Sequence, residues 1–132
     1  MVLVDSNVIL DVATADPAWS EWSAEQLARW LDQGPVVINA IVYGEIAFAT
    51  DRIEVMDDLL PPHLYDYRAI PREAAFLAAR AHASYRSRGG SRQSILPDFL
   101  IGAHALVERL PLLTRDERRY RHAFPGLRLI SP

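Results

Sequence analysis

Five short apolar runs alternate with longer segments of helical pattern, and this alternation leaves few architectures open to the chain. The runs are predicted strands at residues 1–5, 35–39, 65–70, 111–114 and 127–130. A strand, a helix and a second parallel strand in succession form a right-handed crossover unit. We therefore predict an α/β fold, a three-layer α/β/α sandwich in which helices cover a five-stranded parallel sheet.

Signals for helix termini separate these runs. Asp16-Pro17 has the pattern of a cap followed by proline at the first helical position, and Pro97 is expected to open the helix before the fourth strand. No repeat or long linker divides the chain, so residues 1–132 are predicted to form a single domain. The predicted helices cover residues 6–15, 16–33, 40–50, a piece that ends at 59, 71–88, 97–110 and 116–124.

Composition excludes several classes of chemistry. The chain has no cysteine, so disulfides, thiolate nucleophiles and Cys-ligated metals are excluded, and any metal must bind through oxygen or imidazole. No apolar stretch reaches the roughly 18 residues that a membrane span needs. The N-terminus lacks a basic segment and carries Asp5 and Asp11 within its apolar run, which argues against a signal peptide. A cytoplasmic protein without a membrane partner is expected.

Charge is distributed unevenly along the chain. Residues 1–71 hold three arginines against twelve acids, and residues 72–132 hold eleven against five, which gives net charges of −9 and +6. Every basic side chain is arginine, whose guanidinium can bind phosphate through two parallel hydrogen bonds. The same pattern also arises where genome composition favours arginine and the charges only solvate helices. Composition alone leaves both interpretations open.

Two acids are expected at the same edge of the sheet. Asp5 ends the first predicted strand and Asp116 follows the fourth. Open parallel sheets bind ligands beyond the carboxyl ends of their strands, at the point where strand order reverses. If the first and fourth strands are neighbours there, Asp5 and Asp116 face each other across a crevice. Alone, Asp116 is also explained as the cap of a short helix.

Two further acids stand in unusual places. Glu45 lies in an almost wholly apolar helix, where it either reaches the helix edge or belongs to a site, and Asp98 is either a helix cap or a ligand. Carboxylates that share a small pocket repel unless cations are present, and Mg²⁺ or Mn²⁺ prefers oxygen ligands. Two such ions about 4 Å apart would support in-line phosphodiester hydrolysis. Metal-dependent hydrolysis is therefore the predicted chemistry.

Taken in order, these motifs carry a resemblance that spans nearly the whole chain. They are VDSNVILD at the start, a glutamate in the apolar helix after the second strand, LPDFLIGAHA, and LLTRDERRYRHAFPGLRLI at the end. The chain resembles PIN-domain ribonucleases, and specifically the VapC-type toxins of type II toxin-antitoxin systems. The resemblance implies a sheet ordered 3-2-1-4-5, and a Mg²⁺-dependent endoribonuclease that cleaves tRNA or rRNA. The implied acidic quartet is Asp5, Glu45, Asp98 and Asp116, of which Asp5 and Asp98 are the surest metal ligands.

Supporting residues follow from the same resemblance. Ser6, Asn7 and Thr114 match positions that order the ligands or waters. Tyr120 replaces a frequent phenylalanine, a change expected to leave the metal site unaffected. Asp11, on the first helix, is either a group that supports the metal ligands from behind or a solvated helix acid, and solvation is expected. The four histidines show no metal-binding spacing and are not assigned to catalysis.

Partners also follow from the resemblance. It implies a cognate antitoxin whose C-terminal segment packs into an apolar groove formed by the early helices, and a homodimer. Trp19, Trp22 and Trp30 are candidates for that groove, although tryptophans at helical spacing are also typical of a core. The candidate RNA contacts, which equally suit a solvated helix end and loop, are Arg86, Arg88, Arg92 and Arg115.

Rival functional classes lack required residues. Receiver domains and haloacid-dehalogenase-like phosphatases need a lysine, and this chain has none. The phosphatases also need a second aspartate two residues after the first, where this chain has Asn7. The remaining alternative is a catalytically inert PIN fold that binds RNA or protein.

Overall fold

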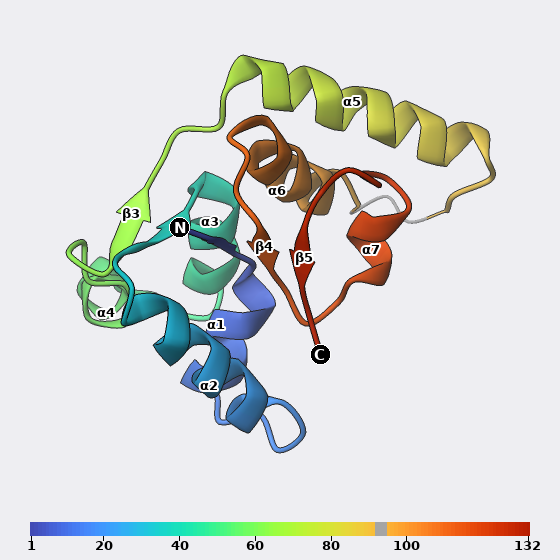
Figure 1. The fold of residues 1–132 in the computed structure, drawn as a ribbon. Helices are drawn as coiled ribbons and strands as arrows, with labels where there is room; N and C mark the ends of the chain where they lie inside the picture. The colour runs from blue at the N-terminus through green and yellow to red at the C-terminus, as the bar shows by residue number, and fades with distance from the viewer. Residues whose placement is uncertain (92–94) are drawn as a thin grey trace.

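The sheet has the predicted topology. A computed structural model describes residues 1–91 and 95–132 (Figure 1). Its five parallel strands lie in the order β3-β2-β1-β4-β5, and Leu3 of β1 pairs with Val37 of β2 on one side and Leu112 of β4 on the other. The α/β prediction and the 3-2-1-4-5 order are confirmed. The strands are β1 (Leu3–Val4), β2 (Val36–Ile38), β3 (Tyr65–Tyr67), β4 (Leu112–Leu113) and β5 (Leu129–Ile130).

Helices connect and cover the strands. The long helix α5 packs along α6, α1 packs on α2, and α3 contacts both α1 and α6 (Figure 1). Within the described residues, no helix combines the length and the apolar character needed to cross a membrane. The helices are α1 (Ser6–Ala13), α2 (Ser20–Leu31), α3 (Ala40–Ala47), α4 (Ile53–Leu59), α5 (Arg72–Ser87), α6 (Ile95–Val107) and α7 (Arg118–Arg121).

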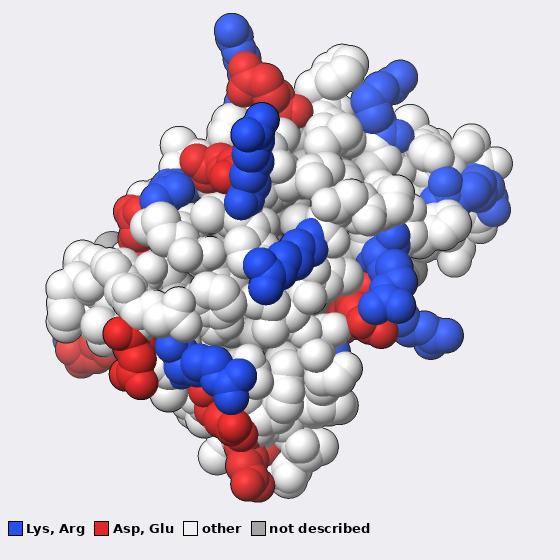
Figure 2. Space-filling model, in the orientation of Figure 1, with Lys and Arg blue, Asp and Glu red and all other residues white. Residues whose placement is uncertain are grey.

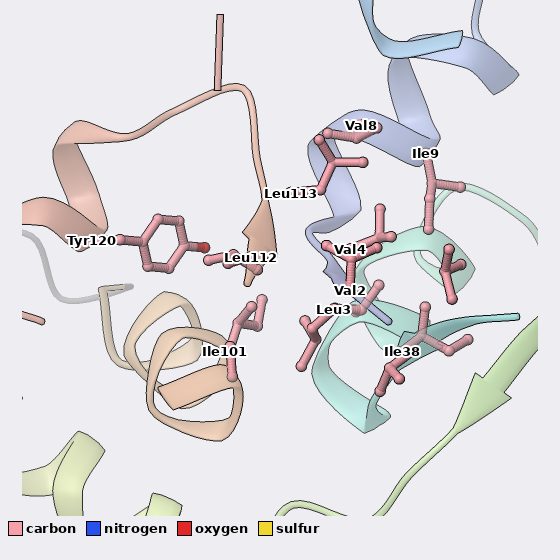
Figure 3. Close-up of a cluster of buried hydrophobic side chains, with 14 of the residues drawn as sticks. Val2, Leu3, Val4, Val8, Ile9, Ile38, Ile101, Leu112, Leu113 and Tyr120 are labelled. Carbon is pink, nitrogen blue, oxygen red and sulfur yellow. The ribbon is translucent and has the colours of Figure 1, made fainter. Parts of the chain in front are cut away.

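The central strands are buried on both faces. Val2, Leu3 and Val4 lie beside Leu112 and Leu113, and all five side chains are inaccessible to solvent (Figure 3). Strands covered by helices on both sides are continuous apolar runs rather than alternating ones, which is why these segments were identifiable from sequence. The core therefore holds the carboxyl ends of β1 and β4 in fixed positions next to each other.

A buried polar chain secures the start of α3. Asn39 caps this helix by accepting hydrogen bonds from the backbone N–H groups of Ile41 and Val42, each at 3.0 Å. Its amide lies 3.0 Å from Nδ1 of His104, which is fully buried and whose Nε2 pairs with Glu108. Both ring nitrogens of His104 are thus engaged within the fold. Its place in the core is consistent with leaving it out of the catalytic assignment.

The predicted starts of α2 and α6 are wrong. The helix α2 begins at Ser20 rather than at Pro17, because the Asp16 carboxylate accepts the N–H groups of residues 18 and 19, both at 2.9 Å, and holds a turn there. The helix α6 begins at Ile95, which places Pro97 and Asp98 inside its first turn, where backbone N–H groups have no helical partner and proline is tolerated. Asp98 is therefore not a cap.

The last short helix also differs from the prediction. The helix α7 covers Arg118–Arg121 only, and Asp116 precedes it by two residues without a capping hydrogen bond to it. Instead, the backbone N–H of Asp116 donates to Oγ1 of Thr114 at 3.1 Å. The interpretation of Asp116 as a cap is therefore wrong as well.

Candidate functional site

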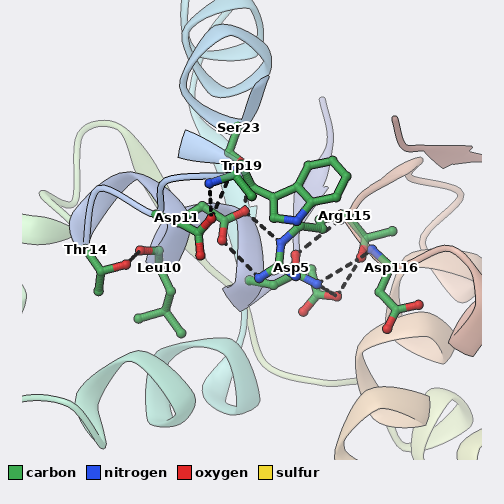
Figure 4. Close-up of polar contacts among 12 residues, drawn as sticks. Asp5, Leu10, Asp11, Thr14, Trp19, Ser23, Arg115 and Asp116 are labelled. Atoms are coloured by element: carbon green, nitrogen blue, oxygen red, sulfur yellow. Dashed lines mark hydrogen bonds and ion pairs between the residues drawn. The ribbon is translucent and has the colours of Figure 1, made fainter. Parts of the chain in front are cut away.

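Asp5 lies where strand order reverses, directly after β1. Its backbone N–H donates to the carbonyl of Leu113 at 2.9 Å, which joins the ends of β1 and β4. Its side chain is only 2% exposed. Thr114 and Asp116 follow β4 at the same edge, so the residues expected at this crevice are together there (Figure 4).

Three side chains donate hydrogen bonds to Asp5. Its Oδ2 accepts from Oγ1 of Thr114 at 2.9 Å, from Nδ2 of Asn7 at 3.4 Å and from the hydroxyl of Tyr120 at 2.7 Å. Asn7 and Thr114 thus occupy the ordering positions that the resemblance implied. The expectation that Tyr120 leaves the site unaffected is wrong, because its hydroxyl, which a phenylalanine lacks, is a direct partner of the first acid.

Burial controls the protonation of two acids. Desolvation raises the pKa of Asp5 above its ordinary value, and hydrogen bonds from Tyr120 and Thr114 oppose part of that rise. Desolvation likewise raises the pKa of Glu45, against the hydrogen bond that Oγ of Ser6 donates to its Oε1 at 2.9 Å. Burial also holds the pKa of Tyr120 well above its usual value, so Tyr120 stays protonated and remains a donor.

Arg119, which the sequence offered only as a possible phosphate contact, lies among the acids of the quartet. Its Nη1 lies 3.3 Å from Oδ2 of the buried Asp98, and its Nε lies 2.9 Å from Oδ2 of Asp116. The angle at Nε does not meet hydrogen-bond geometry, so this nitrogen is buried without a directed partner. Its positive charge also lowers the pKa of Asp5 and of Glu45. One arginine therefore offsets charge on all members of the quartet.

The donor chemistry of the quartet fits a hard divalent cation. All its ligand atoms are carboxylate oxygens, and two of the acids have pKa values raised by burial, which a bound cation would reverse. Within residues 1–91 and 95–132, no three acidic or histidine side chains lie close enough to share one ion as they stand. Arg119 lies among them instead. Metal binding would therefore require the carboxylates to close in and Arg119 to withdraw from Asp98 and Asp116.

The expectation that Asp11 is solvated is wrong. Asp11 is 2% exposed, and Arg115 binds it through Nε to Oδ2 at 2.9 Å and through Nη2 to Oδ1 at 3.0 Å (Figure 4). Ser23 of α2 donates a further hydrogen bond to Asp11 at 2.8 Å. The carboxylate is buried because α1 turns it toward α2 and the loop after β4. The guanidinium of Arg115 is consequently engaged in the fold through Nε and Nη2.

The three tryptophans have different contacts. Trp19 precedes α2, and the guanidinium of Arg115 lies over its ring, 5.8 Å from the centroid (Figure 4). Trp22 and Trp30 are half-buried against the core. None of the three lines the apolar pocket of about 570 Å³ beside Glu45, which is lined by Ser6, Leu10, Ala40, Ile41, Gly44, Glu45, Phe48 and Pro97.

Two of the remaining candidate arginines lie at the C-terminal end of α5. Arg86 and Arg88 are exposed in the last turn of α5 and just after it. Arg92 lies outside the described residues. Nothing in the local sequence distinguishes Arg86 from Arg88, but Arg88 lines a pocket beside α6 and α7 and Arg86 does not line it.

Comparison with known proteins identifies the fold. The family model of the PIN domain matches residues 2–125. The VapBC2 structure from Rickettsia felis, bound to a DNA fragment from its promoter, is similar with a TM-score of 0.73 at 17% identity over 99% of this chain and 98% of that one. VapBC-1 from nontypeable Haemophilus influenzae is also similar, with a TM-score of 0.73 at 17% identity over 99% of this chain and 98% of that one. FitAcB from Neisseria gonorrhoeae has a TM-score of 0.64 at 20% identity over 98% and 96% of the two chains. A comparison with curated protein sequences gives no match.

Proposed function

The chain belongs to the PIN-domain family, and from this premise we propose that it is a metal-dependent endoribonuclease toxin of the VapC type. The observation that carries the proposal is the arrangement of Asp98, Asp116, Asp5 and Glu45 around a single arginine at the carboxyl ends of β1 and β4. Four acids share one arginine, so part of their charge is uncompensated, and their grouping is best explained by a ligand that supplies positive charge.

Each acid has a role in this proposal. Asp5 and Asp98 would be the principal ligands of Mg²⁺ or Mn²⁺, with Asp116 and Glu45 completing the set. A bound ion supplies Lewis-acid charge for phosphodiester hydrolysis. Tyr120 and Thr114 hold the carboxylate of Asp5 in one orientation. Ser6 holds the carboxylate of Glu45 by the hydrogen bond that its Oγ donates to Oε1.

Three partners belong to the same proposal. The similar structures are toxin-antitoxin complexes, and we assign a cognate antitoxin to this chain by analogy with them. The apolar pocket beside Glu45 is the surface best suited to it, because Phe48 at its rim is 95% exposed and Leu10 and Ile41 supply further apolar area. The RNA substrate, tRNA or rRNA, and a homodimer are further parts of the proposal.

Cleavage of RNA by the purified chain tests the catalytic assignment. Wild type should cleave in Mg²⁺ and stop in EDTA, while Asp5→Asn and Asp98→Asn should each lose cleavage by roughly a hundredfold or more. The exposed acid Asp57 on α4 offers a matched control, because Asp57→Asn should cleave at the wild-type rate. RNA ends should be mapped in each reaction. Cleavage that survives both site substitutions, or that needs no divalent ion, would refute the mechanism.

The contact of Arg119 with Asp98 and Asp116 favours a second candidate function. An arginine that neutralises the acids permanently would leave an inert PIN fold that binds RNA or protein. That protein would bind RNA in a mobility-shift assay but would neither cleave it nor bind Mn²⁺. Cleavage by wild type that is lost in Asp98→Asn excludes this candidate.

A further inference from the structure

A second pocket opens next to the acids, between α5, α6 and α7. Its volume is about 320 Å³, within the range of small-ligand sites. Tyr85 and Phe99 line its apolar part, and Arg88, Arg118, Arg119 and His122 line its polar part. Figure 2 shows arginine side chains gathered on the side of the molecule where α5 ends and α7 lies. We call this cavity the α5–α7 pocket.

The aromatic part of the pocket is held rigidly. The Tyr85 ring meets Phe99 edge to face, with centroids 6.0 Å apart, and Phe99 meets Phe124 in the same way at 5.8 Å. Gly90 also lies close to the Tyr85 ring, because a Cβ at this position would lie only 2.4 Å from its Cε1. A fixed aromatic surface of this kind is suited to contact with a nucleobase.

The polar part of the pocket carries positive charge from two helices. Arg88 follows α5, where its Nη1 donates to Oγ of Ser84 at 2.8 Å, and Arg118 is exposed at the start of α7. Guanidinium groups on two sides of a small cavity provide paired donors for a phosphate. Three of the eleven arginines of residues 72–132 line this cavity.

Arg119 connects this pocket to the acids. It lines the pocket and at the same time lies 3.3 Å from Asp98. A nucleotide bound in the pocket would therefore be separated from Asp98 by the Arg119 side chain. The apolar pocket beside Glu45, by contrast, has no basic residue in its lining. Of these two cavities beside the acids, it is the α5–α7 pocket that combines aromatic surface with positive charge.

We propose that the α5–α7 pocket binds one nucleotide of a single-stranded RNA, adjacent to the phosphodiester presented to Asp98. The base contacts the ring of Tyr85, which the buried Phe99 supports from within the core, and the phosphate of that nucleotide is held by Arg88 and Arg118. This inference rests on the proposed function, since it identifies how the same site holds its substrate. It assigns the RNA contact to Arg88 and Arg118 and removes Arg86, which does not line the pocket.

Equilibrium binding without divalent metal tests the proposal separately from cleavage. The probe is a short single-stranded RNA with a fluorescent end label, followed by anisotropy with the full chain. The double variant Arg88→Gln/Arg118→Gln should bind at least tenfold more weakly than the matched double variant Arg86→Gln/Arg121→Gln, which removes equal charge from the same two segments outside the pocket. The slope of log affinity against log salt should fall by about 0.7 for each phosphate that the variant no longer binds. Equal affinities for the two double variants would overturn the proposal.

Tyr85 provides a test that does not depend on charge. Tyr85→Leu should weaken RNA binding by roughly fivefold or more, because the base then has no aromatic ring to stack on, whereas Tyr85→Phe should bind as wild type does. Thermal unfolding of both variants establishes that the fold is retained. Binding that is unchanged in Tyr85→Leu would overturn the base contact.

Competition experiments identify what the pocket recognises. Adenosine 5′-monophosphate should displace the RNA at lower concentration than either adenosine or inorganic phosphate, and Tyr85→Leu should remove that preference. Displacement by phosphate alone at the same concentration would show a simple anion site and overturn the nucleotide assignment.

The double variant Arg88→Gln/Arg118→Gln should bind an antitoxin as wild type does. Weaker binding to the antitoxin with unchanged binding to RNA would identify a protein-docking surface instead.

The two proposals fail in distinguishable ways. If wild type cleaves RNA and the pocket variants bind RNA as their controls do, only the assignment of the pocket is refuted. If wild type binds RNA through the pocket but does not cleave it, the nuclease assignment is refuted and the assignment of the pocket is retained. If wild type binds no RNA, both are overturned.

Discussion

The hydroxyl of Tyr120, which a phenylalanine would lack, donates a hydrogen bond to Asp5. The ring is fully buried and the hydroxyl lies 2.7 Å from Oδ2 of Asp5. Tyr120→Phe should lower the free energy of unfolding by about 1–3 kcal/mol, because a hydrogen bond to a buried acceptor is removed while the ring packing stays. Urea denaturation measures this change. Tyr67→Phe, at an exposed ring, is the control, and an equal effect of the two substitutions would contradict the prediction.

Arg119 is the residue that we expect to oppose metal binding. Its charge lies within 3.3 Å of Asp98 and 2.9 Å of Asp116, so Arg119→Gln should increase the affinity for Mg²⁺ or Mn²⁺ by roughly tenfold or more. Isothermal titration calorimetry measures the affinity directly. Arg118→Gln removes the same charge from the neighbouring exposed residue and should change the affinity much less. Equal changes in metal affinity in the two variants would mean that Arg119 acts only through long-range electrostatics and not through its contacts with Asp98 and Asp116.

At the scale of elements, Asp11 and Arg115 join segments that are distant in the chain. The bidentate pair links α1 to the loop after β4, and Ser23 extends the contact to α2. Arg115→Ala should destabilise the fold by about 3–5 kcal/mol, because it leaves the buried carboxylate of Asp11 without its partner. Denaturation in urea provides the measurement.

A double-mutant cycle separates this pair from general effects of losing an arginine. Adding Asp11→Asn to Arg115→Ala should recover part of the stability, since the unpaired charge is then removed. Arg121→Ala, in an exposed pair with Glu117, should cost about 1 kcal/mol or less. Strictly additive effects of Asp11→Asn and Arg115→Ala on the free energy of unfolding would contradict the account of a buried ion pair.

At the scale of the whole molecule, the acids link stability to pH. Burial raises the folded-state pKa values of Asp5 and Glu45 above their ordinary values of 3.8 and 4.5. The folded chain then binds these protons more strongly than the unfolded chain does. The stability that they contribute is present below the ordinary values and is lost as pH rises through the folded-state values. The metal-free protein is therefore destabilised by these two acids at neutral pH.

Divalent metal should reverse this trend. Mg²⁺ binds the deprotonated acids, so the stabilisation it provides should grow as pH rises from acid to neutral, and Mg²⁺ at about 100 times its Kd would add about 2.7 kcal/mol. Thermal unfolding at a series of pH values, with and without Mg²⁺, measures both effects. Glu45→Gln should stabilise the metal-free protein at neutral pH but not at acid pH. A difference from wild type that is independent of pH would contradict the linkage.

Local sequence was sufficient for the architecture. The apolar runs identified the buried strands because a strand covered on both faces must be apolar along its length. Topological rules for parallel sheets then placed Asp5 and Asp116 at one edge, because the carboxyl ends of parallel strands meet there. The strand order itself came from the family resemblance. Helix starts at Ser20, Ile95 and Arg118 were missed because tertiary contacts and turns override the local signals of proline and aspartate.

Only the tertiary structure decided which side chains meet within that architecture. Tyr120 and Asp5 lie 115 positions apart in the chain, and Arg115 and Asp11 lie 104 apart. Such pairs leave no periodic trace in sequence, since each depends on where helices pack and which rotamers the packed core allows. The sequence alone determined that the chain forms a parallel α/β sheet with acids at its edge. The packing of helices on that sheet decided that Arg119 lies among the acids and that Asp11 is buried, because charge compensation depends on distances in space.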